Sequence, residues 1–265
     1  MKYKGVIHMH STYSYDGKLS LIELKNFLVR QGISFCCMTE HTDEMTFDAA
    51  HAFVTECKKL SDGSFVFIPG FEVPYKDAHI LHIGAEEFVC QFADAEQLSA
   101  WRKVAPLVVL AHPVRNKFTL DSAMESTIDG VEVWNQQYEG KFAPRVRSLK
   151  LLKKLRRKTG CLFATGGLDL HREEHFGAPL TTIEIDSLSQ QNILRALTDG
   201  AYTFGNDSYS LSSEGSLQKG GVFSVHYKSA FSILIITLGK FVNKTLANLG
   251  LSLPPGVRQT IRTRF

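Results

Sequence analysis

The sequence predicts an α/β protein in which strands and helices alternate around a barrel. Short apolar segments rich in β-branched or aromatic residues recur as far as residue 205, and helix-like stretches separate many of them. Strands alternating with helices are typical of a parallel sheet, and this many repeats favour a barrel. A second observation is that several of the apolar segments end in a histidine or an acidic residue. Side chains able to bind metal or catalyse a reaction are therefore expected at strand ends.

The expected elements follow one another along the chain. The strand-like segments read KGVIHMH, ISFCCMTEH, SFVFIPGFEV, HILHIGA, APLVVLAHP, DGVEVWN, CLFATGGLDLH, LTTIEI and AYTFG. Helices are expected over residues 19–31, 47–60, 95–104, 142–158 and 189–198. Ser20 followed by Glu23 is a capping-box pattern, which indicates the start of the first helix.

Composition and charge set the broad class and a domain boundary. The chain is 44% hydrophobic and 22% charged, and its start, MKYKGVIHMHS, lacks the apolar core of a secretion signal. Its five cysteines form no CxxC pair, so reduced thiols and a cytoplasmic location are expected. Residues 215–265 contain seven Lys or Arg and no Asp or Glu. We therefore expect a main domain over residues 1–210 and a basic extension over residues 211–265.

Residues able to bind metal cluster at the ends of the expected strands. They are His8, His10, Asp16, His41, Glu72, His82, His112, Asp169 and His171. Strand ends at one face of a barrel converge, and alternate residues of a strand point to the same side. Imidazole and carboxylate groups together suit borderline divalent metals, and nine ligands are too many for one ion. The pattern predicts a site for two or three ions of Zn, Mn or Fe, an arrangement suited to phosphate ester hydrolysis.

The motifs HMHSTYSYDG, TEHTD, GFEV, HIG, AHP and GLDLH, in this order, resemble the PHP (polymerase and histidinol phosphatase) family of metal-dependent phosphoesterases. The resemblance runs from about residue 4 to residue 204. It implies a distorted (β/α)7 barrel, with the nine residues above as ligands of up to three metal ions. Glu72 would bridge two ions, and Asp169 would share one with the pair His8 and His10. His82 fits the family spacing better than His79, which leaves His79 a supporting role near the ligands.

The leading functional hypothesis is a metal-dependent phosphoesterase that acts on a phosphomonoester, a nucleotide or a short oligonucleotide through a metal-activated hydroxide. Arg115, three residues after His112, is a candidate for holding the phosphate, and His79 is a second candidate catalytic residue. Two alternatives keep the same site: an amide or ester hydrolase, and a non-catalytic metal-binding regulatory module. A small phosphorylated substrate or short nucleic acid is the expected partner.

The basic extension is expected to be partly helical. On a helical wheel of residues 229–250, the apolar side chains gather on one side; they are Phe231, Leu234, Leu238, Phe241, Val242 and Leu249. The unbroken apolar core is short, so the sequence predicts no transmembrane span. Packing of this amphipathic helix on its own domain or on a second copy is preferred to contact with an anionic membrane surface. The basic stretch 141–158 is expected to be a solvated helix face, with nucleic-acid contact as the alternative.

Overall fold

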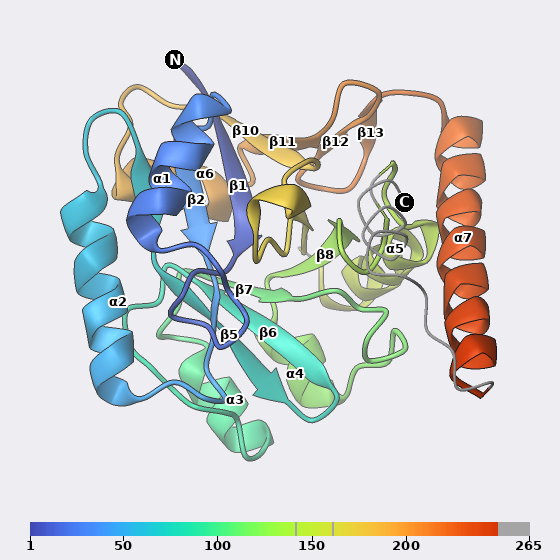
Figure 1. The fold of residues 1–265 in the computed structure, drawn as a ribbon, viewed down its shortest axis with the longest axis horizontal. Coiled ribbons are helices and arrows are strands. Elements are labelled where there is room, and N and C mark those ends of the chain that lie inside the picture. The colour runs from blue at the N-terminus through green and yellow to red at the C-terminus, as the bar shows by residue number, and fades with distance from the viewer. Residues whose placement is uncertain (141, 161, 249–265) are drawn as a thin grey trace.

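Two β-sheets lie side by side in the centre of the protein, and helices cover their outer faces (Figure 1). The structure, a computed structural model, describes residues 1–140, 142–160 and 162–248. The α/β class expected from the sequence is confirmed. The strand pairings among the described residues form two sheets. They do not show the closed (β/α)7 barrel that the resemblance implies.

The first sheet has seven strands in the order β13-β12-β11-β10-β1-β2-β4. Their bounds are β1 (Lys2–Met9), β2 (Phe35–Met38), β4 (Val66–Ile68), β10 (Leu180–Glu184), β11 (Tyr202–Gly205), β12 (Ser210–Ser212) and β13 (Leu217–Lys219). The pairs β1–β2 and β2–β4 are parallel, and the remaining pairs are antiparallel. Because β12 and β13 extend this sheet, the main domain continues past the boundary expected at residue 210.

The second sheet has six strands in the order β3-β5-β6-β7-β8-β9. Their bounds are β3 (Glu40–His41), β5 (Gly70–Tyr75), β6 (Ala78–Ile83), β7 (Leu107–Leu110), β8 (Gly130–Asn135) and β9 (Phe163–Gly167). Strand β6 is antiparallel to both neighbours, and the other pairs are parallel. A bridge between Met9 and Leu170 joins the two sheets, so strand ends from both sheets meet at one place.

The five expected helices are all present, with ends that differ by a few residues. They are α1 (Leu21–Arg30), α2 (Phe47–Leu60), α3 (Ala95–Trp101), α5 (Val146–Thr159) and α6 (Gln190–Thr198). The capping box is confirmed: the Glu23 carboxylate accepts the Ser20 N–H at 2.9 Å, and Ser20 Oγ accepts the Glu23 N–H. Helix α4 (Ser122–Thr127) and a 3₁₀ turn (Glu173–His175) are too short to show a period and were missed.

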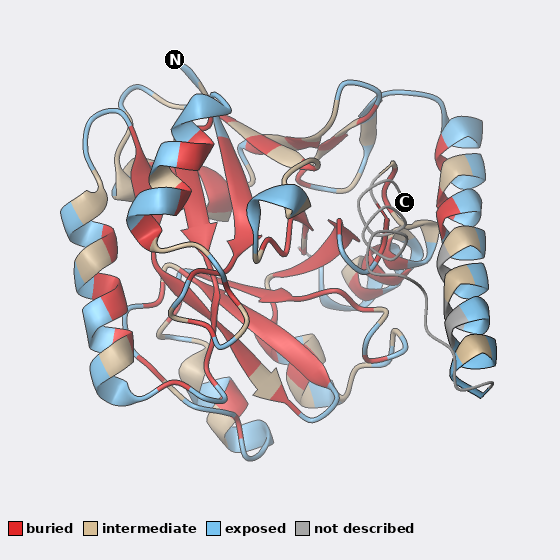
Figure 2. Ribbon diagram, in the orientation of Figure 1, coloured by how far each residue is buried: buried red, intermediate tan, exposed pale blue. Residues whose placement is uncertain are grey.

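The core lies between the sheets and the helices that cover them. Figure 2 shows most strands of the second sheet and the neighbouring strands β1, β2 and β4 mostly buried, and all residues of β7 and β8 are so. Helices α1 and α2 contribute the inward face of each turn, including Leu24 and Phe53. This packing gives the strand ends that carry the polar residues a rigid base.

Helix α7 (Val222–Asn248) stands at the edge of the molecule beside α5 (Figure 1). Within the described residues it is the one helix that is long and apolar enough, by length and composition, to cross a membrane. By this measure the apolar segment is longer than its unbroken apolar core suggests, and the expectation that it does not span a bilayer stays a prediction. Length and composition alone do not decide where the helix lies, because core helices of soluble proteins pass the same test.

Candidate metal centre

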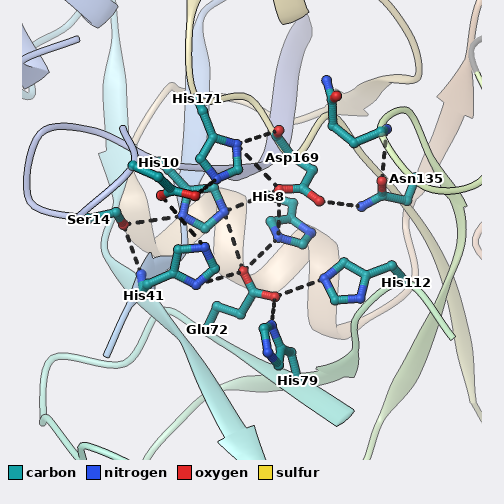
Figure 3. A network of polar contacts seen from close by, with 12 residues as sticks. His8, His10, Ser14, His41, Glu72, His79, His112, Asn135, Asp169 and His171 are labelled. Atoms are coloured by element: carbon teal, nitrogen blue, oxygen red, sulfur yellow. Dashed lines mark hydrogen bonds and ion pairs between the residues drawn. The ribbon is translucent and has the colours of Figure 1, made fainter. Parts of the chain in front are cut away.

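Polar side chains from both sheets converge at the joined strand ends (Figure 3). Four overlapping groups, each with ligand atoms within 4.8 Å of one another, are of the kind that holds a metal ion. Together they comprise His8, His10, His41, Glu72, His79, His112, Asp169 and His171. Seven of these eight residues belong to the ligand set expected from the sequence, and the eighth is His79.

Glu72 is the centre of the cluster, as the resemblance implies. Its side chain is fully buried, and its Oε2 lies 3.0 Å from His8 Nε2. Its Oε1 lies 2.9 Å from His112 Nε2 and contacts His79 Nδ1. His10 and His41 approach Oε2 at 3.3 and 3.4 Å. A buried carboxylate facing five imidazoles has the position expected of a ligand shared between ions.

Three members of the cluster have left-handed backbone conformations that non-glycine residues rarely adopt. The φ angles are 65° at His8, 23° at His112 and 53° at Asp169. Such conformations cost free energy and persist where the surrounding structure enforces them, often at functional sites. Here each one lies within or just after a strand, at a residue whose side chain belongs to the cluster.

Glu132 is a site residue that the sequence analysis missed. It is fully buried on β8, and His8 Nδ1 donates to its Oε1 at 2.9 Å. Its Oε2 accepts the His112 N–H at 2.7 Å and the Asn135 side-chain amide at 3.0 Å. Asn135 also donates to Asp169 at 3.3 Å. Glu132 thus fixes the imidazole of His8 and the backbone of His112, and an acidic residue inside the apolar segment GVEVWN was the available signal.

Glu40 fixes the loop that follows β1. It is buried beside His41 and accepts the Ser11 N–H at 2.9 Å and the hydroxyls of Ser11 and Ser14. Ser14 Oγ in turn accepts the His41 N–H at 2.9 Å and lies 3.3 Å from His10 Nδ1. These bonds hold the loop that carries Asp16 against the cluster.

The structure places His82 outside the cluster, contrary to the sequence-based choice between His79 and His82. The two residues are three positions apart on β6, so they face opposite sides of the sheet. The His82 ring packs on Phe92, with centroids 5.2 Å apart. Burial, with the Arg102 charge, lowers the pKa of His82 to about 4. His79 takes the place expected of His82.

Asp16 and Arg115 lie at the rim of the cluster. Asp16 Oδ2 is 3.1 Å from His171 Nε2, and the Asp16 side chain is 39% exposed. Arg115 is exposed and makes a backbone bond to His112, as expected for a residue in the turn after β7. Tyr15 stacks on His41 and Tyr138 lies against His112, with centroids 5.1 and 4.6 Å apart. Burial raises the pKa of both tyrosines, and the Arg115 charge opposes the rise.

The electrostatics of the cluster favour cations. Although burial alone would lower the pKa of His10, the carboxylates of Asp169 and Glu72 raise it to about 9. Burial, with the neighbouring His10 charge, lowers the pKa of His41 to about 3. Burial works to raise the pKa of Glu72, yet the imidazoles around it hold that pKa well below its usual range. The central carboxylate therefore stays ionised at neutral pH.

The residues present fit divalent metal ions. Among the described residues, His10 Nε2, His171 Nε2, His112 Nδ1 and Asp16 Oδ1 are buried without a hydrogen-bond partner. Unpaired buried polar atoms are costly, and three of these four belong to residues of the cluster, which also holds ionised carboxylates. A donor set of imidazole nitrogen and carboxylate oxygen suits Zn, Mn or Fe.

Comparison with known proteins agrees with this geometry. The family model described as "PHP domain" matches residues 7–200, so the chain belongs to the PHP family, whose members are generally metal-dependent hydrolases. No curated protein sequence matches the chain.

Two solved structures share the fold. PsfC from Pseudomonas syringae PB-5123 matches with a TM-score of 0.54 and 16% identity, covering 87% of this chain and 97% of PsfC. The lesion-specific endonuclease PfuEndoQ from Pyrococcus furiosus matches with a TM-score of 0.54 and 15% identity. That match covers 80% of this chain and 59% of the endonuclease. At these identities the likeness shows the fold alone.

Proposed function

We propose that this protein is a metal-dependent phosphoesterase that hydrolyses a phosphomonoester, a nucleotide or a short oligonucleotide. The observation that carries the proposal is the buried Glu72 carboxylate, which faces five imidazoles beside Asp169. Membership of the PHP family supports the reaction class. One protein that shares the fold is a lesion-specific endonuclease, which supports nucleic acid as one substrate type.

The overlapping groups indicate which residues would hold each ion. Glu72 belongs to the group with His8 and His10 and to the group with His41 and His79. The other two groups are His8, His112 and Asp169, and His10, His41 and His171. Divalent ions bound there supply a water molecule of lowered pKa and neutralise the charge of the phosphate. Since Glu72 is shared by two groups, it would bind two ions at once.

The residues at the rim suit the organic and phosphate parts of a substrate. Arg115 is exposed beside the cluster, and its guanidinium would hold phosphate oxygens in a bidentate contact. Tyr15 and Tyr138 are 54% and 40% exposed, so each presents part of its ring next to the cluster. Flat groups such as nucleobases stack on such rings. Glu132 and Asn135 would keep the ligands oriented during turnover.

The proposal is tested with protein that has been stripped by a chelator and reloaded with Mn or Zn. Phosphomonoesters, nucleotides, short oligonucleotides, and aryl amides and esters would be assayed beside His41→Ala. Metal-dependent release of phosphate or cleavage of the oligonucleotide, lost in His41→Ala, supports the proposal. Cleavage of only the amides or esters, or metal binding without any turnover, would overturn it.

A further inference from the structure

Helix α7 exposes a continuous apolar face. Nine of the fifteen large hydrophobic side chains that are exposed among the described residues lie on this one helix. Six of them recur at intervals of three or four and so share one face; they are Phe223, Tyr227, Phe231, Leu234, Leu238 and Phe241. Phe223 is 94% exposed and Phe241 67%. Exposed apolar patches of this extent mark interaction sites.

The opposite face of α7 packs on the domain through small residues. Ser232 is 1% exposed, and a side chain on Gly140 would meet its Cβ at 2.9 Å. Ser229 is also buried, and its Oγ accepts the Val146 N–H at 3.3 Å. Figure 2 shows the outer side of the helix in the exposed colour along most of its length. Five of the six apolar side chains that the sequence places on one side of this helix are therefore exposed rather than packed on the domain, and the sixth, Leu249, lies outside the described residues.

The segment that carries this apolar face and the helix beside it are basic. The last described segment of the chain, residues 215–248, contains four Lys and no acidic residue. Helix α5, which packs beside α7, has seven Lys or Arg and no acidic residue. The two helices, together with residues 211–217, line a groove of about 620 Å³ whose lining includes Leu149 and Val225 as well as Lys150 and Lys153. Its one acidic residue, Glu214, lies 3.5 Å from Arg156 and is partly neutralised.

We infer that the α5–α7 face binds the surface of an anionic lipid bilayer, with the apolar face of α7 among the acyl chains and the basic residues at the headgroups. Charge complementarity selects this occupant. A helix with one apolar face and basic flanks binds at the interface of an anionic bilayer, and each lysine near the surface adds attraction. Tyr227 and Phe231, whose rings stack with centroids 6.3 Å apart, are of the amphipathic and aromatic type enriched at that depth.

The other occupants of this face fit less well. A second copy of α7 would place basic residues opposite basic residues, with no acidic side chain in residues 215–248 to pair with them. A spanning arrangement would require α7 to leave the domain, which would free the buried contacts of Ser229 and Ser232. A helix held along its side by a folded domain lies in the interface plane.

The test is flotation of the full chain, made by cell-free translation with vesicles present. The vesicles contain phosphatidylcholine alone or phosphatidylcholine mixed with phosphatidylglycerol. We expect flotation with the mixed vesicles, weaker flotation with the neutral ones, and release by high salt. The double variant Leu234→Gln/Leu238→Gln is expected to lower the bound fraction by roughly tenfold or more.

Matched control variants test whether a loss of vesicle binding is specific to the α5–α7 face or is a general effect of surface mutation. Ile22 and Val29 are exposed to a similar extent on α1, so Ile22→Gln/Val29→Gln is expected to float like the wild type. Lys150→Glu/Lys153→Glu is expected to weaken binding to the mixed vesicles only. The proposal is overturned if the wild type floats with neither vesicle or if the Leu234/Leu238 variant floats equally well. It is also overturned by resistance to alkaline and high-salt washes, which indicates a span. Dimerisation that the same variant abolishes, without flotation, would assign the face to a second copy.

Discussion

The metal centre and helix α7 differ in how their side chains relate to the rest of the chain. In the metal centre, polar residues from both sheets are buried and point at one another, with Glu72 in the middle. In α7, apolar residues are exposed and point away from the protein. Both arrangements reverse the usual preference of polar groups for water and apolar groups for the core. Each reversal therefore indicates a partner: cations in the first case and lipid in the second.

The largest effect is expected from removing the carboxylate that the groups of the metal centre share. Glu72→Gln keeps the shape of the side chain but removes its charge, so the ions would lose a common ligand. We expect phosphoesterase turnover to fall by about a thousandfold or more, because such ions supply several kcal/mol of charge stabilisation. Glu139→Gln is the control. Burial raises the pKa of Glu139 to about 8, so this buried carboxyl is already largely neutral at pH 7. Unchanged turnover in Glu72→Gln would refute the role of Glu72.

A smaller effect is expected from pH in the metal-free protein. Burial alone would lower the pKa of His10, but the nearby carboxylates raise it in the folded state from 6.5 to about 9. The stability that this proton contributes is fully present below pH 6.5 and is lost as pH rises through about 9. The raised pKa corresponds to about 3 kcal/mol. Denaturant titrations of chelator-treated protein should show this loss, and His10→Gln should flatten it. Metal affinity should increase over the same range, because protons compete with the ions. A flat stability profile in the wild type would contradict the account.

A more moderate effect is expected from replacing Glu132, since this residue acts on the metal centre only through its neighbours. Glu132→Gln weakens the bonds that orient His8 and His112. We expect metal affinity to fall by roughly 10–100-fold, measured by competition with a chelator of known affinity. Because Glu132 supports ligands and contacts no substrate, the KM of metal-saturated protein should stay close to that of the wild type. A change confined to KM would contradict this role.

The smallest effects concern the two faces of α7. Ser232→Leu enlarges a side chain held against Gly140, and we expect it to lower the free energy of unfolding by about 1–3 kcal/mol. Leu234→Gln, two positions along and 55% exposed, should change it by less than about 0.5 kcal/mol. Urea denaturation of the two variants measures both. Equal destabilisation would show that the apolar face is packed after all.

The longer helices, and the strand ends that carry the clustered residues, could be predicted from local sequence patterns. Strand-like segments ending in His, Glu or Asp located seven of the eight clustered residues, because a strand end fixes where a side chain can point. Spacing could not choose between His79 and His82, since the choice depends on which face of β6 turns toward Glu72. Glu132 was missed because its role lies in two contacts with residues distant in sequence. The helical pattern of α7 was visible, but the side that packs on the domain depends on Gly140 and the loop around it.

The most direct test of the metal centre is the metal content of two variants of β6. Purified wild type, His79→Asn and His82→Asn would be dialysed against Mn or Zn, passed over a desalting column and analysed for metal per chain. The account predicts two or three ions in the wild type, a loss of at least one in His79→Asn, and wild-type content in His82→Asn. Loss of metal in His82→Asn with full content in His79→Asn would contradict it.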